Sequence, residues 1–299
     1  MLTLSRGDDS LVVAPGHGGA IVGLTRGGTH MFRRPSPQAV LLGQLGAMGC
    51  FPLVPFCNRI ANRRFDWAGQ SHELTPNFGD HPHAIHGVGW QRPWQVEEAS
   101  ATAITLSLRH DTADESAHAW PFAFSAQIIY SLAEQGLTIE IAATNLHPAP
   151  APMGLGVHPY FPRAPGARIA FQADGVWMND PDMLPATHEP IPAAWDHTRG
   201  GAVDSERLDN CFTGWRGEAT LPGLRIVADP ILANLQVFTP TGADFFCVEP
   251  VSHVPDAINR PGLPNARAMT VLARGETLNG SITFFPGGGA SAANTGSAA

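Results

Sequence analysis

The chain has 299 residues, and 43% of them are apolar, so it can bury a substantial core and is not expected to be disordered as a whole. Its formal net charge is −8, with 26 acidic against 18 basic residues. This balance argues against a nucleic-acid-binding protein, which needs clustered positive charge. We interpret the short basic pairs Arg33-Arg34 and Arg63-Arg64 as solvated surface.

Several residue types and motifs that cofactor chemistry requires are missing from the sequence. All 18 basic residues are arginines, which excludes Schiff-base chemistry, pyridoxal phosphate anchoring and the lysine of a P-loop. No two of the four cysteines have CxxC spacing, and neither a GxSxG elbow nor a dinucleotide fingerprint occurs. We therefore expect no cofactor. Because no signal peptide and no membrane-spanning run is recognisable, we expect a cytoplasmic protein with no membrane partner.

Taken in chain order, the sequence favours β-strands over helices, because 27 prolines and 32 glycines interrupt most windows long enough for a helix. Alternating apolar and polar residues predict strands over 103–109, 123–132 and 137–144, the last two joined by a short loop that carries a glycine. Further strands are predicted over 224–228, 234–239, 245–248 and 281–285. Short strands separated by glycine and proline turns are typical of an antiparallel sandwich or barrel, here one domain over 1–286 with a disordered tail over 287–299.

Two ionisable residues stand in apolar, strand-like surroundings. Glu249 follows an apolar run and precedes Pro250, which we expect to end the strand. A partly desolvated carboxylate at a strand end is a better base near neutral pH. His158 stands before Pro159-Tyr160-Phe161-Pro162, a rigid and apolar segment that suits a fixed acid. The alternatives are a surface glutamate at the start of a turn and a packed, hydrogen-bonded core histidine.

Other polar residues can bind a ligand rather than react with it. Arg59 and His86 can donate hydrogen bonds to a polyol and Asp209 can accept them, although Arg59 fits a structural ion pair equally well. The histidines of Asp80-His81-Pro82-His83-Ala84-Ile85-His86 invite a zinc site. However, Pro82 fits a strand interior badly, and no matching cysteine or carboxylate motif follows. We therefore predict no metal site.

A set of short motifs in a fixed order adds to these observations. They are, in chain order, Asn58-Arg59-Ile60, His86-Gly87, His158-Pro159-Tyr160-Phe161, Asp209 with Phe212, the run 234–239 that carries Gln236, and Glu249-Pro250. Each motif is weak alone, but the ordered set spans most of the chain and resembles the aldose 1-epimerase (galactose mutarotase) family. The resemblance implies an all-β fold, a large antiparallel β-sandwich of the galactose mutarotase-like supersandwich type, with a sugar bound in an open cleft on one sheet.

The resemblance also implies a role for each matched residue. His158 corresponds to the general acid and Glu249 to the general base of a reaction that interconverts the α and β anomers of a free aldose by ring opening and closure. Glu249 is then expected to be ionised and His158 protonated, so that Glu249 gives the acid limb of a bell-shaped pH profile and His158 the alkaline limb. The implied substrate-binding residues are Asn58, Arg59, His86, Tyr160, Asp209 and Gln236. The implied partner is a monosaccharide, and the reaction needs no metal or cofactor.

Two other functions stay open at this stage. A glycoside hydrolase on a related β-sandwich needs two carboxylates beside the scissile bond, for which Glu249 and Asp209 are the candidates. A non-catalytic carbohydrate-binding protein would use aromatic platforms such as Trp90 or Trp215. The segment at His86 reads His-Gly-Val-Gly-Trp rather than the family's usual His-Gly-Gly, which leaves the sugar open among galactose, glucose, arabinose, fucose and similar sugars. A phosphorylated hexose would need a cluster of arginines, for which Arg59 with Arg63 or Arg64 is the candidate, and the net negative charge favours a neutral sugar. A monomer and a homodimer are equally compatible with the sequence.

Overall fold

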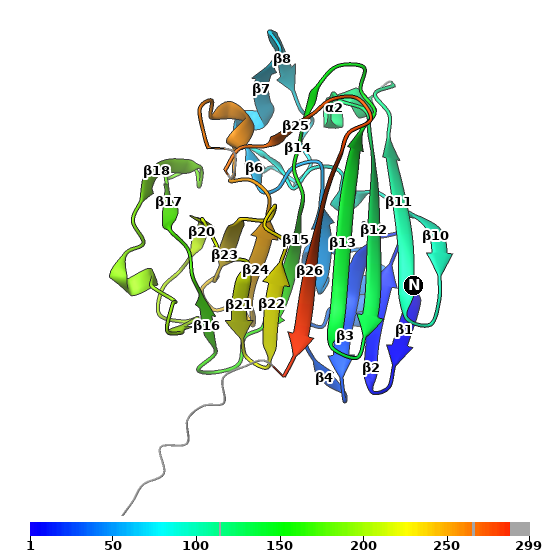
Figure 1. Cartoon of the computed structure of the whole chain (residues 1–299), viewed down its shortest axis with the longest axis vertical. Helices are drawn as coiled ribbons and strands as arrows, with labels where there is room; N and C mark the ends of the chain where they lie inside the picture. Colours follow the sequence, from blue (N-terminus) through cyan, green and yellow to red (C-terminus); the bar gives the residue numbers. More distant parts are fainter. Residues whose placement is uncertain (114, 265–266, 288–299) are drawn as a thin grey trace, which may run out of the picture.

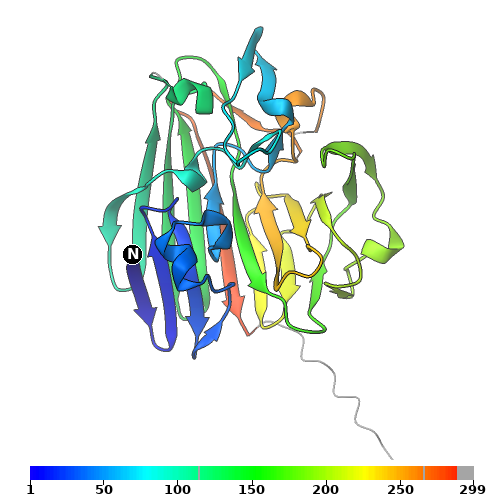
Figure 2. The same cartoon turned by 180° about the vertical axis from the view of Figure 1, so that it is seen from behind.

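Two large antiparallel β-sheets lie face to face (Figure 1). The main cluster of buried apolar side chains contains residues of both sheets. The computed structural model describes residues 1–113, 115–264 and 267–287. Within them the larger sheet has 11 strands and the smaller sheet has nine, and the view from behind brings the larger sheet to the front (Figure 2). The predicted antiparallel β-sandwich is therefore confirmed.

The larger sheet draws its strands from both halves of the chain. Their order is β1 (Leu2–Arg6), β2 (Asp9–Ala14), β3 (Ala20–Arg26), β5 (Cys50–Leu53), β15 (Gly156–Pro162), β24 (Phe245–Val251), β23 (Asn234–Phe238), β20 (Asp209–Thr213), β17 (Gly175–Asn179) and β18 (Pro185–Glu189), with β4 (Thr29–His30) paired to β3. Strands β15 and β24, which carry the two residues predicted to react, are thus neighbours at the centre of this sheet.

The smaller sheet contains the long, regularly alternating strands. Their order is β10 (Gln95–Ala99), β11 (Ala103–His110), β12 (Phe124–Ala133), β13 (Gly136–Asn145), β26 (Thr277–Pro286), β22 (Leu224–Ala228), β21 (Glu218–Leu221), β16 (Arg168–Phe171) and β19 (Gly201–Ala202). In β13, Leu137, Ile139 and Ile141 are buried while Glu140 is exposed, because successive side chains of a strand point to opposite faces. Every strand that the sequence predicted is present, several of them with longer bounds.

The remaining elements are short. Three two-stranded pairs are β6 (Arg59–Ile60) with β9 (Ala84–Ile85), β7 (Arg64–Trp67) with β8 (Gln70–Glu73), and β14 (Ala151–Met153) with β25 (Thr270–Leu272). The helical segments are α1 (Pro37–Leu41), α2 (Ser116–Ala119), and the 3-10 turns η1 (Leu45–Ala47), η2 (Ala61–Arg63), η3 (Gly89–Gln91), η4 (Ala193–Trp195) and η5 (Ala257–Asn259). Among the described residues, no helix has the length and apolar character needed to cross a bilayer. Except for Gly287, the tail predicted to be disordered lies outside the described residues, and the single domain over 1–286 stays a prediction.

Strand β24 corrects one prediction. We expected Pro250 to end the strand directly after Glu249, but β24 continues beyond the proline and pairs with β23. The ladder between β15 and β24 is instead interrupted along residues 157–159 and 248–250. Pro159 and Pro250 lie in this gap, where neither ring nitrogen has a hydrogen to donate. Glu249 therefore stands within a central strand and not at its end.

Phe284 of β26 connects the two sheets. Its ring lies 5.1 Å from that of Phe32, edge to face, and 6.5 Å from that of Phe161 of β15, measured between centroids. All three side chains are buried in the main apolar cluster. The contact joins the back of the strand that carries His158 to the opposite sheet.

We expect Phe284→Ala to lower the free energy of unfolding by about 3–5 kcal/mol, because it leaves a cavity between the sheets. The neighbouring Phe285 is partly exposed and packs against the guanidinium of Arg225, 4.5 Å away. Phe285→Ala should therefore cost no more than about 1 kcal/mol. Urea denaturation followed by tryptophan fluorescence measures both values. Equal losses in the two variants would contradict this account of the core.

Candidate active site

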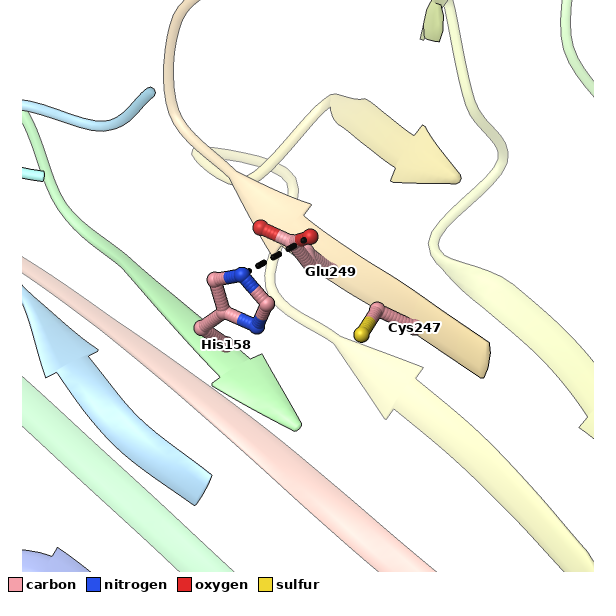
Figure 3. A group of neighbouring side chains, drawn as sticks. All are labelled: His158, Cys247 and Glu249. Carbon is pink, nitrogen blue, oxygen red and sulfur yellow. Dashed lines mark ion pairs between the residues drawn. The ribbon is translucent and has the colours of Figure 1, made fainter. Parts of the chain in front are cut away.

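His158 and Glu249 lie opposite one another across the interrupted ladder between β15 and β24. The register on both sides of the gap places them in one cross-strand row, and their side chains point toward one another (Figure 3). The distance from His158 Nε2 to Glu249 Oε1 is 3.5 Å. Only 7% of His158 and 2% of Glu249 is exposed. The sheet thus places an imidazole and a carboxyl group together in a nearly dry environment.

Both side chains keep a polar atom without a partner. His158 Nδ1 and Glu249 Oε2 make no hydrogen bond with any residue that the structure describes. Leaving a buried polar atom unpaired costs about 1–3 kcal/mol, so such atoms require an explanation, for example a water or a ligand that supplies their partners. Their presence beside a cavity indicates a place where a polar ligand supplies the partners.

Burial sets the protonation of this pair. It raises the pKa of Glu249 well above its ordinary value, an effect that the negative charge of Asp209 increases and that Arg59 opposes. It lowers the pKa of His158 to about 3, to which the positive charge of Arg33 contributes. An uncharged pair, with the proton on Glu249 and a neutral imidazole, is therefore favoured over the ion pair. The sequence-based expectation of an ionised glutamate and a protonated histidine is the opposite arrangement, and it stays a prediction.

A cavity of about 350 Å³ opens directly over this pair. Its size lies at the lower end of the range for small-molecule sites. The lining residues are Arg33, Gly46, Phe51, Asn58, Arg59, Phe78, His81, Ile85, His86, Trp90, His158, Tyr160, Asp209, Phe238, Phe245 and Glu249. All the predicted site residues except Gln236 are among them.

Two residues with left-handed backbone conformations shape one wall of the cavity. Asn58 has a φ of 55° and His86 a φ of 61°, which is uncommon for residues other than glycine. The backbone N–H of His86 donates to the Asn58 carbonyl, and the backbone N–H of Asn58 donates to His86 Nδ1, 3.2 Å away. Burial lowers the pKa of His86 well below its ordinary value, so the ring is neutral. Since Nδ1 accepts, Nε2 carries the hydrogen, and His86 is a neutral donor in the cavity wall.

The residue after His86 is Gly87, and the backbone around it leaves no room for a side chain. Its φ is +72°, and a Cβ added there would lie 2.3 Å from the carbonyl oxygen of Val54. The chain forms an isolated bridge between these two residues. A side chain at this position would push the His86 loop away from the sheet.

A second wall is an ion-pair network centred on Asp209. Arg59 Nη2 donates to Asp209 Oδ2 at 2.9 Å, and Arg59 Nη1 donates to Asn58 Oδ1 at 3.2 Å. Gln236 Nε2 donates to Asp209 Oδ1 at 2.7 Å. Gln236 thus lies behind Asp209 and orients its carboxylate, while Asp209 and Arg59 line the cavity. The structural and the ligand-binding interpretations of Arg59 are compatible, because it makes an ion pair in the cavity wall.

Arg33 corrects another prediction. We interpreted the pair Arg33-Arg34 as solvated surface, which is right for Arg34 but wrong for Arg33, which is partly buried and lines the cavity. The reason is a backbone contact: the N–H of Arg33 donates to the carbonyl of Tyr160 and fixes the segment after β4 beside β15. No local signal in the sequence distinguishes the two arginines.

The aromatic residues of the cavity were only partly anticipated. Trp90 lines the cavity, but Trp215 is buried in the apolar cluster and cannot serve as a platform. Phe51, which pairs with His158, and Tyr160, whose ring stacks on His158 at 4.5 Å with the planes 12° apart, enclose the imidazole. Sequence patterns alone gave no reason to select Phe51, because its strand is buried at every position.

The predicted absence of a metal site rests on the histidines at 81–86, and the structure gives their nitrogens other partners. His83 Nδ1 accepts from the N–H of Asn62, and His81 Nδ1 accepts from the N–H of His83. A different group, His158 with Cys247 and Glu249, has donor atoms within 4.8 Å of one another (Figure 3). Burial raises the pKa of Cys247 well above its ordinary value, so that in the absence of a metal ion it is a thiol.

The comparisons with known proteins agree with this arrangement. Residues 1–284 match the family model described as aldose 1-epimerase. The uncharacterized protein YphB of Escherichia coli K12 is 31% identical over 296 residues, which cover 94% of this chain and 97% of YphB. The chain therefore belongs to the aldose 1-epimerase family.

Solved structures show the same fold. A crystal structure from Escherichia coli K12 described as a "Putative aldose 1-epimerase" is 31% identical, with a TM-score of 0.83 and coverage of 95% of this chain and 97% of that one. A galactose mutarotase-like protein of Clostridium acetobutylicum has a TM-score of 0.84 at 18% identity, with 95% and 94% of the two chains covered. The fold is thus that of galactose mutarotase-like proteins.

The protonation of His158 can be measured directly. Because burial lowers its pKa to about 3, the imidazole should stay neutral as the pH falls through the ordinary range of histidine near 6.5. We expect ¹⁵N NMR to show the shifts of a neutral ring for His158 at about pH 6, with the signal assigned by its loss in His158→Asn. A titration midpoint near 6.5 would refute the uncharged pair.

Proposed function

We propose that the chain is an aldose 1-epimerase that interconverts the α and β anomers of a free aldose. The observation that supports this most strongly is the buried approach of His158 Nε2 to Glu249 Oε1, 3.5 Å apart, in the wall of a cavity of about 350 Å³. Membership of the family supports the same reaction. A monosaccharide is the proposed partner.

The reaction needs two proton transfers that act together. Glu249 as a carboxylate removes the proton of the C1 hydroxyl while protonated His158 gives a proton to the ring oxygen. The bond between C1 and the ring oxygen breaks, and the sugar becomes an open-chain aldehyde. After rotation about C1–C2, neutral His158 takes the proton back from the C5 hydroxyl as its oxygen attacks C1, and Glu249 reprotonates the C1 oxygen. Concerted transfer avoids a full charge on either oxygen and typically contributes about 10²–10⁴-fold.

The pair holds one proton at every stage of this cycle. It is an ion pair before the ring opens, and a neutral imidazole with a protonated carboxyl group while the sugar is open. Burial favours the second form in the free protein, so we expect sugar binding to be accompanied by transfer of the proton from Glu249 to His158 across their short separation. Hydrogen bonds from the sugar to the charged pair favour this transfer.

The remaining wall residues suit the binding of a polyol. His86 is a neutral donor, Arg59 a charged donor and Asp209 an acceptor, and all three line the cavity. Asn58 accepts a hydrogen bond from Arg59, and Gln236 acts through Asp209 as a positioning residue. Tyr160 stacks on His158 and fixes the orientation of its ring.

The alternative functions are less well supported by these contacts. A glycoside hydrolase would need Asp209 as the second catalytic carboxylate, but one Asp209 oxygen accepts from Arg59 and the other from Gln236. A protein that only binds sugars has no use for a buried histidine and glutamate with strongly shifted pKa values. Both observations favour the epimerase.

Removing either reacting group should lower turnover by at least about tenfold, and by up to about 10⁴-fold. We expect this for Glu249→Gln and for His158→Asn, because each variant lacks the group that carries out one of the two proton transfers. NMR exchange spectroscopy of free aldoses measures the rate after subtraction of the uncatalysed exchange. The exposed Glu98 gives a matched control, since Glu98→Gln changes the same charge outside the cavity. Normal exchange in Glu249→Gln, with an unchanged circular dichroism spectrum, would rule out the assignment.

The pH profile should be bell-shaped with its limbs assigned opposite to the sequence-based expectation. Activity falls on the acid side when the pair gains a second proton. Because the pKa of His158 is lowered to about 3, we expect this only near that pH. It falls on the alkaline side when the pair loses its last proton, at the raised pKa of Glu249. We therefore expect catalysed exchange to show no acid limb between about pH 5 and about pH 7. An acid limb centred near the ordinary pKa of histidine would contradict this.

A further inference from the structure

Arg33 lies in the cavity wall but belongs neither to the ion pair of Arg59 with Asp209 nor to the pair of His158 with Glu249. Its guanidinium carbon is 4.0 Å from the centroid of the Tyr160 ring and 4.4 Å from that of Phe245. Nη2 donates to the carbonyl of Gly46 at 2.5 Å and is 3.4 Å from that of Met48. The side chain is thus held in place by rings and by backbone carbonyls.

The charge of Arg33 is not balanced by a carboxylate at ion-pair distance among the described residues. Several other arginines have a carboxylate oxygen within 4.0 Å of a guanidinium nitrogen, but no such pair involves Arg33 among the described residues. The buried Nε of Arg33 has no hydrogen-bond partner there. The exposed Asp244 attracts it from a greater distance. A guanidinium remains charged even when burial lowers its pKa, so Arg33 is a partly desolvated cation.

The other charges of the wall cancel. Arg59 is paired with Asp209 at 2.9 Å, and His158 with Glu249 shares one proton and has no net charge in either form. Burial lowers the pKa values of His81 and His86, which keeps both rings neutral. Within the described lining, Arg33 therefore leaves the cavity with a net positive charge. A desolvated charge of this kind is stabilised by an anion.

The position of Arg33 indicates which part of a sugar it would meet. His158 stacks on one face of the Tyr160 ring, so the guanidinium over the same ring lies on its other face. His158 is the proposed donor to the ring oxygen, and the ring oxygen of a hexopyranose is bonded to C5, which carries C6. In a sugar placed with C5 on the Tyr160 side of His158, a substituent on C6 extends along Tyr160 and toward Arg33.

We propose that Arg33 binds an anionic group on C6 of the sugar, so that the substrate is an aldose that carries a phosphate or a carboxylate at this position. The inference rests on the proposed epimerase function, which places the ring oxygen at His158. Planar guanidinium groups bind both kinds of anion through two parallel hydrogen bonds.

The test compares anionic and neutral sugars of the same stereochemistry in wild type and variants. Exchange spectroscopy gives kcat/KM for glucose, glucose 6-phosphate and glucuronate, and for the corresponding galactose series. We expect wild type to prefer at least one anionic sugar to its neutral counterpart by about tenfold or more, the gain of one charge-assisted hydrogen bond. The phosphate and carboxylate arms show which anion is bound.

Arg33→Gln should reduce this preference to within about twofold, and Arg33→Lys should retain part of it, because lysine keeps the charge without the fork geometry. Arg34→Gln is the matched control, since it removes the same charge from the exposed neighbour and should leave the preference as it is. Thermal melting of all variants shows whether they fold.

Two results would overturn the inference. One is a wild-type protein that exchanges anionic and neutral sugars equally well. The other is an Arg33→Gln variant that loses both activities to the same extent, which would indicate a purely structural role. If no sugar is exchanged at all, the proposed function fails, and calorimetric binding of glucose 6-phosphate decides the inference alone. Binding that is lost in Arg33→Gln then supports an anion site, whereas no binding to wild type refutes it.

Discussion

The 3.5 Å approach of His158 Nε2 to Glu249 Oε1 is the contact on which the rest of this structure depends. Two ionisable groups buried in the middle of a sheet destabilise a fold unless their charges are removed or matched. One shared proton meets this condition in both of its arrangements, as an uncharged pair or as an ion pair. Because burial favours the first and hydrogen bonds from a sugar favour the second, the same pair is compatible with a stable sheet and with acid–base chemistry.

The larger sheet holds this contact through strands that are far apart in the sequence. Phe51 of β5 pairs with His158, and Gln236 of β23 pairs with Glu249, so one row of side chains crosses four neighbouring strands. The gap in the ladder between β15 and β24 is where two prolines are tolerated in central strands. The smaller sheet packs behind this row (Figure 1) and gives it the rigidity that fixed proton-transfer geometry requires.

Strand β13 could be predicted because one of its faces is buried and the other is solvated. Strand β5 is buried at every position, has no alternation and was not predicted, whereas β23 and β24, which are almost as fully buried, were predicted. The ordered motifs could list the candidate residues but not their arrangement. Whether Gln236 meets a ligand or Asp209 depends on the pairing of β20 with β23, and the place of Arg33 depends on a backbone hydrogen bond to distant Tyr160. Such long-range pairings cannot be recognised from the residues next to them in the sequence.

The charge balance of the cavity wall separates reaction from recognition. The ring oxygen and the C1 hydroxyl are common to all cyclic aldoses, so in the proposed reaction His158 and Glu249 would not discriminate among sugars. Discrimination must come from the rest of the wall, where the charges of Arg59 and Asp209 cancel. Under the proposal for Arg33, a further cation at the edge would change which substituents are accepted, while its effect on the pKa of His158 is smaller than that of burial. Specificity can therefore vary within this fold without altering the proton-sharing pair.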